Sequence, residues 1–300
     1  MRLARSLVLA MAALLDAGCS LIPEHTDDPA PVVRGPEPAR LQHPLALNFL
    51  AFRPRRASTQ GDGTTDVAWD SHYSSIYFNQ KDGPDESVYL DGELWTNAIR
   101  ARHGIGEHAD IEIEIGVLRA GGGFLDPIVN DFHRAFGFPD GGRPDAKDGD
   151  YQMRIRANGE TAYELESHEI GLLDIPIVWT QNLVAEDEGQ PAISLRLGVE
   201  LPTGNQNKGF GNGQVDYGLG LLGERSVGRW TFTGATDYVF TRRSDDFREA
   251  DIQMDDLWDV QAGAEYRWND SGSLLAQLVG IGVSKPPVSR SRPPVAQQNR

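Results

Sequence analysis

Apolar and polar residues alternate along much of the chain. In Asp110-Ile111-Glu112-Ile113-Glu114-Ile115, one face is aliphatic and the other is acidic. The same period of two runs through residues 193–200, 230–241 and 258–268, and the last of these stripes carries an aromatic residue at each end. Successive side chains of a strand point to opposite faces of a sheet, so this pattern predicts an all-β protein.

Further strands are expected at 44–53, 67–79, 87–102, 151–157, 160–166, 169–184, 213–223 and 272–284. The Asn158-Gly159 pair favours a tight hairpin between two of them. Long strands with charges on the polar face and aromatics at the ends of the apolar stripe are typical of outer-membrane proteins. The sequence therefore predicts an antiparallel transmembrane β-barrel of about 10–12 strands. The alternative is a soluble β-sandwich or barrel, whose strands also alternate.

A short amphipathic helix is predicted in the 124–138 loop, where apolar residues recur every four positions. The residues that define it are Phe124, Ile128, Phe132, His133 and Phe136. Asp126 is placed to cap the helix, Pro127 suits its first turn, and Gly137 ends it. The helix is expected to pack on the rim of the barrel or to fill it in part. The alternative is a lid or plug that controls access to the lumen.

The N-terminal residues predict export. An apolar run from Leu7 to Leu15 follows two arginines and is too short to span a membrane, which fits a signal peptide over residues 1–18. Ala17-Gly18-Cys19 resembles a bacterial lipoprotein processing site, so Cys19 is the predicted lipidation site; the alternative is an ordinary signal with an incidental cysteine. The predicted domains are then a Pro-rich tether over 19–43, lipid-anchored or free, the barrel over 44–284, and a Pro-rich disordered tail over 285–300.

Composition excludes several functions. The 28 Lys and Arg against 44 Asp and Glu give a net charge of -16 with no basic cluster, so nucleic acid is not an expected partner. A mean hydropathy of -0.41 argues against a helical membrane protein. The single Cys cannot form an internal disulfide, and no two of the seven His lie four residues apart as in a helical zinc site. No metal and no cofactor are therefore expected.

A catalytic site is not expected either. Glu164, Glu166 and His168 would share one face of a strand, and Ser167 lies beside them. Ser167 would point to the opposite face from His168, so the two cannot act as a nucleophile and its base. The chain is therefore predicted not to be an enzyme.

Acidic residues are the main functional signal. If the apolar positions face lipid, the charged residues that face the lumen are Asp91, Glu93, Asp110, Glu112, Glu114, Arg196, Glu200, Asp216, Asp237, Asp259, Glu265 and Arg267. A lumen lined by carboxylates favours cations. The alternative is a small barrel whose inward polar residues form a packed, hydrogen-bonded interior without a pore.

Three motifs carry a resemblance to a known family. They are Pro44-Leu45-Ala46-Leu47, the Asp131–Gly137 core of the predicted helix, and Leu201-Pro202-Thr203-Gly204 followed by Gly209-Phe210-Gly211-Asn212-Gly213. Over about residues 40–284 the chain resembles a family of Gram-negative exported proteins catalogued as a domain of unknown function, number 3187. The resemblance implies an outer-membrane β-barrel and no reaction. The chain departs at its end, because Pro286-Pro287 and Pro293-Pro294 cannot belong to the aromatic-ended closing strand that the barrel assembly machinery reads.

The sequence thus predicts a protein of the Gram-negative outer membrane that acts as a passive channel or uptake barrel for small solutes. Its expected partners are outer-membrane lipid, the barrel assembly machinery and small solutes. The alternative is a structural or binding protein of the envelope without transport, either a filled barrel or a lipid-anchored periplasmic β domain.

Overall fold

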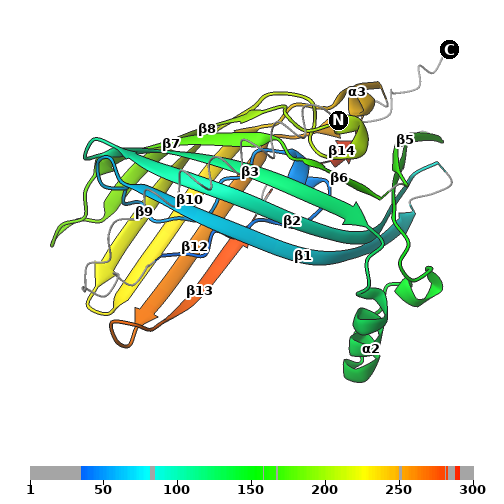
Figure 1. Ribbon diagram of the computed structural model, residues 1–300, viewed down its shortest axis with the longest axis horizontal. Helices are drawn as coiled ribbons and strands as arrows, with labels where there is room; N and C mark the ends of the chain where they lie inside the picture. Colours follow the sequence, from blue (N-terminus) through cyan, green and yellow to red (C-terminus); the bar gives the residue numbers. More distant parts are fainter. Residues whose placement is uncertain are drawn as a thin grey trace, which may run out of the picture.

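A strongly curled antiparallel sheet forms most of the computed structural model (Figure 1). The structure describes residues 35–81, 85–157, 159–166, 168–249, 252–280, 282 and 288–290. Within them, twelve strands form the main sheet. These are β1 (Thr65–Lys81), β2 (Ser87–Ile105), β3 (Ala109–Gly121), β4 (Gln152–Ala157), β5 (Glu160–Leu165), β6 (Glu169–Leu172), β7 (Ile175–Val184), β8 (Ala192–Leu201), β9 (Asp216–Val227), β10 (Trp230–Phe240), β12 (Leu257–Arg267) and β13 (Ser273–Gly280). A separate small sheet pairs β11 (Ile252–Met254) with β14 (Val288–Arg290).

The strands follow one another as an antiparallel meander from β13 through β12, β10, β9, β8, β7 and β3 to β2. At the β2 end of this meander, the whole of β1 pairs with one edge of β2. The other edge of β2 pairs with β3 and then with β4, β5 pairs with β4, and β6 pairs with the end of β3. The predicted antiparallel all-β fold of about 10–12 strands is confirmed. Among the described strands, β1 and β13 each pair with one neighbour, so the sheet is an open half-barrel.

The predicted faces agree with the register. On β12 the side chains of Trp258 and Val260 are exposed and those of Asp259 and Gln261 are buried. The predicted hairpin around Gly159 is also present, since β4 and β5 pair directly on either side of it. Period-two alternation therefore fixed both the strands and their orientation in this part of the chain.

One predicted strand and one predicted helix cap differ from expectation. Residues 44–53 were predicted to form a strand and do not: they contain the 3-10 turn η1 (Ala46–Asn48) and lie inside the curl of the sheet. Leu47 and Leu50 are buried there among side chains from several strands, so the segment packs by its side chains without joining the sheet. The predicted helix is confirmed as α2 (Asp126–Phe136), but Asp126 does not cap it.

The remaining helical elements are η2 (Arg143–Asp145), η3 (Gln206–Lys208) and α3 (Asp245–Glu249). No helix in the described part of the chain is long and apolar enough to cross a membrane. The predicted signal peptide, Cys19, the first part of the tether and most of the tail lie outside the described residues, so those domain boundaries stay predictions.

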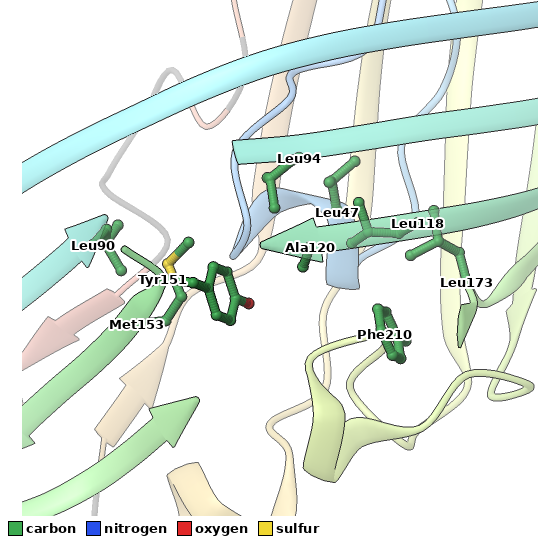
Figure 2. Close-up of a cluster of buried hydrophobic side chains, with 9 residues drawn as sticks. All are labelled: Leu47, Leu90, Leu94, Leu118, Ala120, Tyr151, Met153, Leu173 and Phe210. Atoms are coloured by element: carbon green, nitrogen blue, oxygen red, sulfur yellow. The ribbon is translucent and has the colours of Figure 1, made fainter. Parts of the chain in front are cut away.

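A hydrophobic cluster joins the segment inside the curl to the end of the sheet. Figure 2 shows Leu47 from η1 next to Leu94 of β2 and Leu118 of β3. The other members are Leu90, Ala120, Tyr151, Met153, Leu173 and Phe210. A second cluster brings Phe49, Leu50 and Phe52 against Val178, Val239 and Leu257. Apolar side chains thus anchor residues 47–52 to both halves of the sheet.

Candidate functional site

The concave face of the sheet is lined by buried charged residues and covered by residues 35–60, which we call the N-terminal segment. This segment contacts β3, β8, β9, β10 and β12. A single segment can reach all five strands only from inside the curl of the sheet. It carries four arginines, Arg40, Arg53, Arg55 and Arg56. Their partners are carboxylates of the strands.

Arg53 pairs with Glu114 of β3 through two hydrogen bonds, Nε to Oε2 at 3.0 Å and Nη2 to Oε1 at 2.6 Å. Arg40 approaches the same carboxylate, with Nη1 at 3.6 Å from Oε1. Burial and the nearby charge of Arg53 lower the pKa of Arg40. Two guanidinium groups therefore share one buried carboxylate. Separating the segment from β3 would leave buried charges without partners, which is strongly unfavourable.

Arg55 makes an equivalent pair with Asp110 of β3, at 2.9 Å from Nη1 to Oδ1 and 2.8 Å from Nη2 to Oδ2. Arg102 of β2 donates to the same carboxylate at 2.9 Å. Arg56 binds the carboxylate of Glu224 on β9, and these hydrogen bonds raise the pKa of Arg56. Bidentate pairing of this kind fixes geometry as well as charge.

A further ion pair holds the wall of the curl to the backbone of the N-terminal segment. Arg196 of β8 forms two hydrogen bonds to Asp237 of β10, at 2.6 and 2.5 Å, and donates from Nη1 to the carbonyl oxygen of Arg53 at 2.8 Å. Its guanidinium lies over the ring of Phe52, 4.7 Å from the ring centre. Both members of the pair are fully buried.

Two strand glycines make room for this contact. A Cβ added at Gly198 of β8 would lie 2.9 Å from the Phe52 ring, and one at Gly218 of β9 would lie 2.6 Å from it. Real Cβ atoms are not found so close to another side chain, so any larger residue at these positions would displace Phe52. Gly198 and Gly218, on neighbouring strands, therefore allow the Phe52 ring of the N-terminal segment to pack directly against the sheet.

The other acidic residues of the concave face bond mainly to backbone or amide groups. Asp216 accepts hydrogen bonds from the Asn212 side chain at 2.8 Å and from the Arg242 amide at 2.9 Å. Glu265 accepts the Gly35 amide at 2.9 Å. Glu200 is buried, and neither of its carboxylate oxygens accepts a hydrogen bond from the described residues. The concave face thus keeps acidic groups that the segment's arginines do not neutralise.

Two small cavities lie between the N-terminal segment and the sheet. A cavity lined by Pro36, Pro54 and strands β10 and β12 measures about 10 Å³. Another, beside Leu45 and Phe49, measures about 20 Å³. Each is close to the space that one water molecule needs. At both places the segment fills the curl, and burial there lowers the pKa of His43 in the same segment.

The structure separates the predicted lumen-facing residues into two groups. Ten of the twelve lie on the concave face: Asp110, Glu114, Arg196, Glu200, Asp216, Asp237, Asp259 and Glu265 are buried there, and Glu112 and Arg267 are half-buried. Asp91 and Glu93 are buried on the opposite, convex face of β2. Glu93 accepts hydrogen bonds from Tyr73 at 2.5 Å and from the Leu125 amide. The loop after β3 covers these two carboxylates, which parity alone did not show.

The convex face exposes large apolar side chains on nearly every strand. Those at least a third exposed include Trp69, Trp95, Ile111, Ile113, Ile193, Leu197, Leu219, Leu221, Trp230, Phe232, Tyr238, Phe240, Trp258, Val260, Leu274 and Leu278. A water-soluble domain keeps such side chains inside and charges outside. Here the burial of the two residue classes is inverted between the faces.

The predicted helix lies outside the curl. Figure 1 shows α2 projecting away from the sheet next to the end of β3. Its loop rests on the convex side, where Phe124 contacts Tyr73 and Arg143 donates to Ser75 at 3.0 Å. The N-terminal segment, and not α2, occupies the concave face. The helix residues Ile128, Phe132 and Phe136 are exposed, and His133 is half-buried.

The residues near His168 form an exposed ion-pair group. Arg154 bonds to Glu164 at 2.5 Å and lies 3.4 Å from Glu166. His168 is exposed, with its ring edge-on to Tyr151. Ser167 lies outside the described residues. Across the part of the chain that the structure describes, no group of three or more His, Cys, Asp or Glu side chains is arranged to hold a metal ion.

A protein-family model matches residues 32–284 of the chain, and the family is described as "Protein of unknown function (DUF3187)". The chain belongs to this family. The resemblance inferred from the sequence motifs is thereby confirmed. No curated protein matches the chain. Among solved structures, the protein is similar to the COG4313 outer membrane channel from Pseudomonas putida F1, with 13% identity and a TM-score of 0.47 over 77% of this chain and 76% of that one.

Proposed function

We propose that this member of the DUF3187 family is an outer-membrane protein whose convex face contacts lipid. The observation that carries the proposal is the inversion of burial, with aliphatic and aromatic side chains exposed on the convex face and charged side chains buried on the concave face. In water this arrangement would leave a large apolar surface exposed, whereas in a bilayer it places apolar groups in hydrocarbon.

The width of the apolar band supports the same proposal. The apolar face of β12 runs from Trp258 to Tyr266, and the exposed Trp268 follows directly after the strand, ten residues from Trp258. At about 3.3 Å per residue this is about 33 Å of strand, or about 25 Å along the membrane normal for a tilt of about 40°. That height equals the apolar band of outer-membrane barrels, and a Trp at each end suits the two interfaces.

Within the membrane we propose a passive channel for small solutes that the N-terminal segment holds closed. Three observations support a channel with a closure: the inward face is polar, the segment that fills it is not part of the sheet, and ion pairs hold it there. Arg53, Arg55 and Arg56 supply three of these pairs. Displacing the segment would uncover the strand carboxylates, and the open channel would then prefer cations.

Conductance across planar bilayers tests the channel. The unchanged chain is expected to conduct little, and the triple variant Arg53→Gln/Arg55→Gln/Arg56→Gln is expected to conduct more and to select cations. Arg154→Gln is the matched control, because it removes an arginine from an exposed ion pair outside the concave face. The proposal is wrong if the triple variant, inserted and folded, conducts no more than the empty membrane.

A second candidate is a structural envelope protein with a permanently filled interior. The water-sized cavities at the segment and the buried Arg196–Asp237 pair favour it. This candidate predicts that the triple variant inserts, migrates as a heat-modifiable band in detergent gels and remains non-conducting. The same experiment therefore separates the two functions.

A further inference from the structure

Helix α2 exposes its apolar side to solvent. Phe132 and Phe136 are 51% and 67% exposed, and the two rings lie 4.7 Å apart. Gly137 ends the helix with φ 68°, and the Phe138 amide then bonds to the His133 carbonyl oxygen at 3.0 Å. This turn folds Phe138 back onto Phe132, with ring centres 5.8 Å apart. The helix therefore ends in an exposed cluster of three phenylalanine rings.

The apolar side of α2 is continuous with the convex face of the sheet. Phe124, at the start of the helical segment, lies 5.3 Å from Tyr73 of β1 between ring centres. Tyr73 in turn lies 6.4 Å from Trp95 of β2. Phe124 and Trp95 are 64% and 40% exposed. One exposed aromatic surface thus runs from the middle of β1 and β2 to the tip of α2.

A groove of about 570 Å³ opens at the base of α2, between the helical segment, the middle of β2 and the end of β3. Tyr73, Trp95 and Phe124 form aromatic walls, and Arg119 of β3 supplies a guanidinium. Arg119 is opposite Trp95 in the β2–β3 register and is exposed. It makes no side-chain hydrogen bond and no ion pair with the described residues. The groove therefore combines an unpaired cation with an apolar aromatic wall.

The glycines before α2 build this groove. A Cβ on Gly122 would overlap the Gly149 carbonyl, and one on Gly123 would overlap the Glu93 carboxylate. Glycine is therefore needed at both positions for the backbone to pass over Glu93 and leave the groove open beside it. Glu93 is occupied by the Tyr73 hydroxyl and the Leu125 amide. Its negative charge is thus screened by two donors at the floor of the groove.

We infer that this groove binds the phosphate headgroup of a membrane lipid, with Arg119 at the phosphate and the phenylalanines of α2 among the adjoining acyl chains. The inference rests on the proposed outer-membrane location. A lipid satisfies both parts of the surface, since an amphipathic helix with aromatic residues on one side lies in the bilayer interface. A free phosphate would meet one arginine near a carboxylate and gain nothing from the aromatic walls.

Native mass spectrometry of the full chain in detergent tests the headgroup contact. Phosphatidylglycerol is compared with a diacylglycerol of the same acyl chains that lacks phosphate. Arg119→Gln is expected to weaken phosphatidylglycerol binding about tenfold, the loss of one charge-assisted hydrogen-bonded contact. The control, Arg134→Gln, removes an exposed arginine from the polar side of α2 and is expected to leave binding unchanged. Equal binding by Arg119→Gln and the unchanged chain, or displacement of the lipid by excess inorganic phosphate, would overturn the inference.

Nitroxide labels in phosphatidylglycerol vesicles test the position of α2 independently. A label at Phe136 is expected to be accessible to oxygen and shielded from a water-soluble nickel chelate, and a label at Arg134 is expected to show the reverse. A third label at Leu221, on the convex face of β9, reports membrane insertion. A lipid-exposed Leu221 label with a water-exposed Phe136 label overturns the inference and leaves the outer-membrane proposal standing. Water exposure at Leu221 as well overturns both.

Discussion

The proposed contact of the convex face with lipid predicts that the free-energy cost of an inserted charge depends on its depth along a single strand. Leu221 lies near the middle of β9 and Val227 at its end, six residues apart and on the same face. Both side chains are largely exposed, at 48% and 57%. The comparison therefore varies depth while strand, face and exposure stay nearly constant.

The spacing of the two residues gives the expected magnitude. Six residues correspond to about 20 Å of strand and about 15 Å along the membrane normal at a tilt of about 40°. If Leu221 lies near the midplane, Val227 lies near the interface. Arginine is expected to destabilise the folded state by about 2–4 kcal/mol at Leu221 and by about 0–1 kcal/mol at Val227. In a water-exposed sheet, both substitutions would change stability by about 0.5 kcal/mol or less.

Urea titration of folding into phospholipid vesicles measures these free energies. Leu221→Ala and Val227→Ala are the matched controls, because they remove the apolar side chain without adding a charge. A difference of less than about 0.5 kcal/mol between the two arginine variants, each corrected by its alanine control, would refute the assignment of the convex face to lipid.

Three further predictions concern the segment inside the curl and the loop outside it. In a double-mutant cycle measured by denaturant titration, Arg53→Met and Glu114→Gln should each lower the free energy of unfolding by about 3 kcal/mol. The double variant should lose at least about 1 kcal/mol less than the sum of the two single losses, and additive losses would contradict the buried pair. Leu47→Ala should cost about 2–5 kcal/mol by emptying the cluster that anchors η1, as measured in the same titration. Gly122→Ala should displace the turn at Gly149 and speed proteolysis within residues 122–150, with unchanged cleavage elsewhere; equal cleavage rates would speak against the close approach.

Local pattern was enough to predict most of the strands and, outside β2, the faces of their charged residues. Apolar and polar side chains alternate along β10 and β12 because one face of each strand is exposed and apolar and the other is buried and polar, so every second residue carries the same information. The helix α2 was predictable for the same reason, since its apolar residues, proline and glycine all lie within fifteen positions. These features depend on neighbours in the sequence.

The contents of the concave face were not predicted, because they depend on distant partners. Arg56 and Glu224 are 168 positions apart, and Arg53 and Glu114 are 61 apart. Residues 45–52 form an apolar run that only Asn48 interrupts, and such a run also suits a buried strand. The available signal was charge: three arginines within residues 53–56 precede a series of strands with acidic faces. Asp91 and Glu93 were misplaced because a loop, not strand parity, buries them.

The ion pairs between the N-terminal segment and the strands determine when the acidic residues of the concave face can select cations. With the N-terminal segment in place, its arginines neutralise Asp110, Glu114 and Glu224, which lowers the net negative charge of the interior. If the segment moves, four arginines leave together and the strand carboxylates remain, with Arg102, Arg196 and Arg267 too few to balance them. Opening and cation preference would then arise in one step. An acidic wall is therefore a property of the opened state, which is why conductance should be compared between the unchanged chain and the variant that releases the segment.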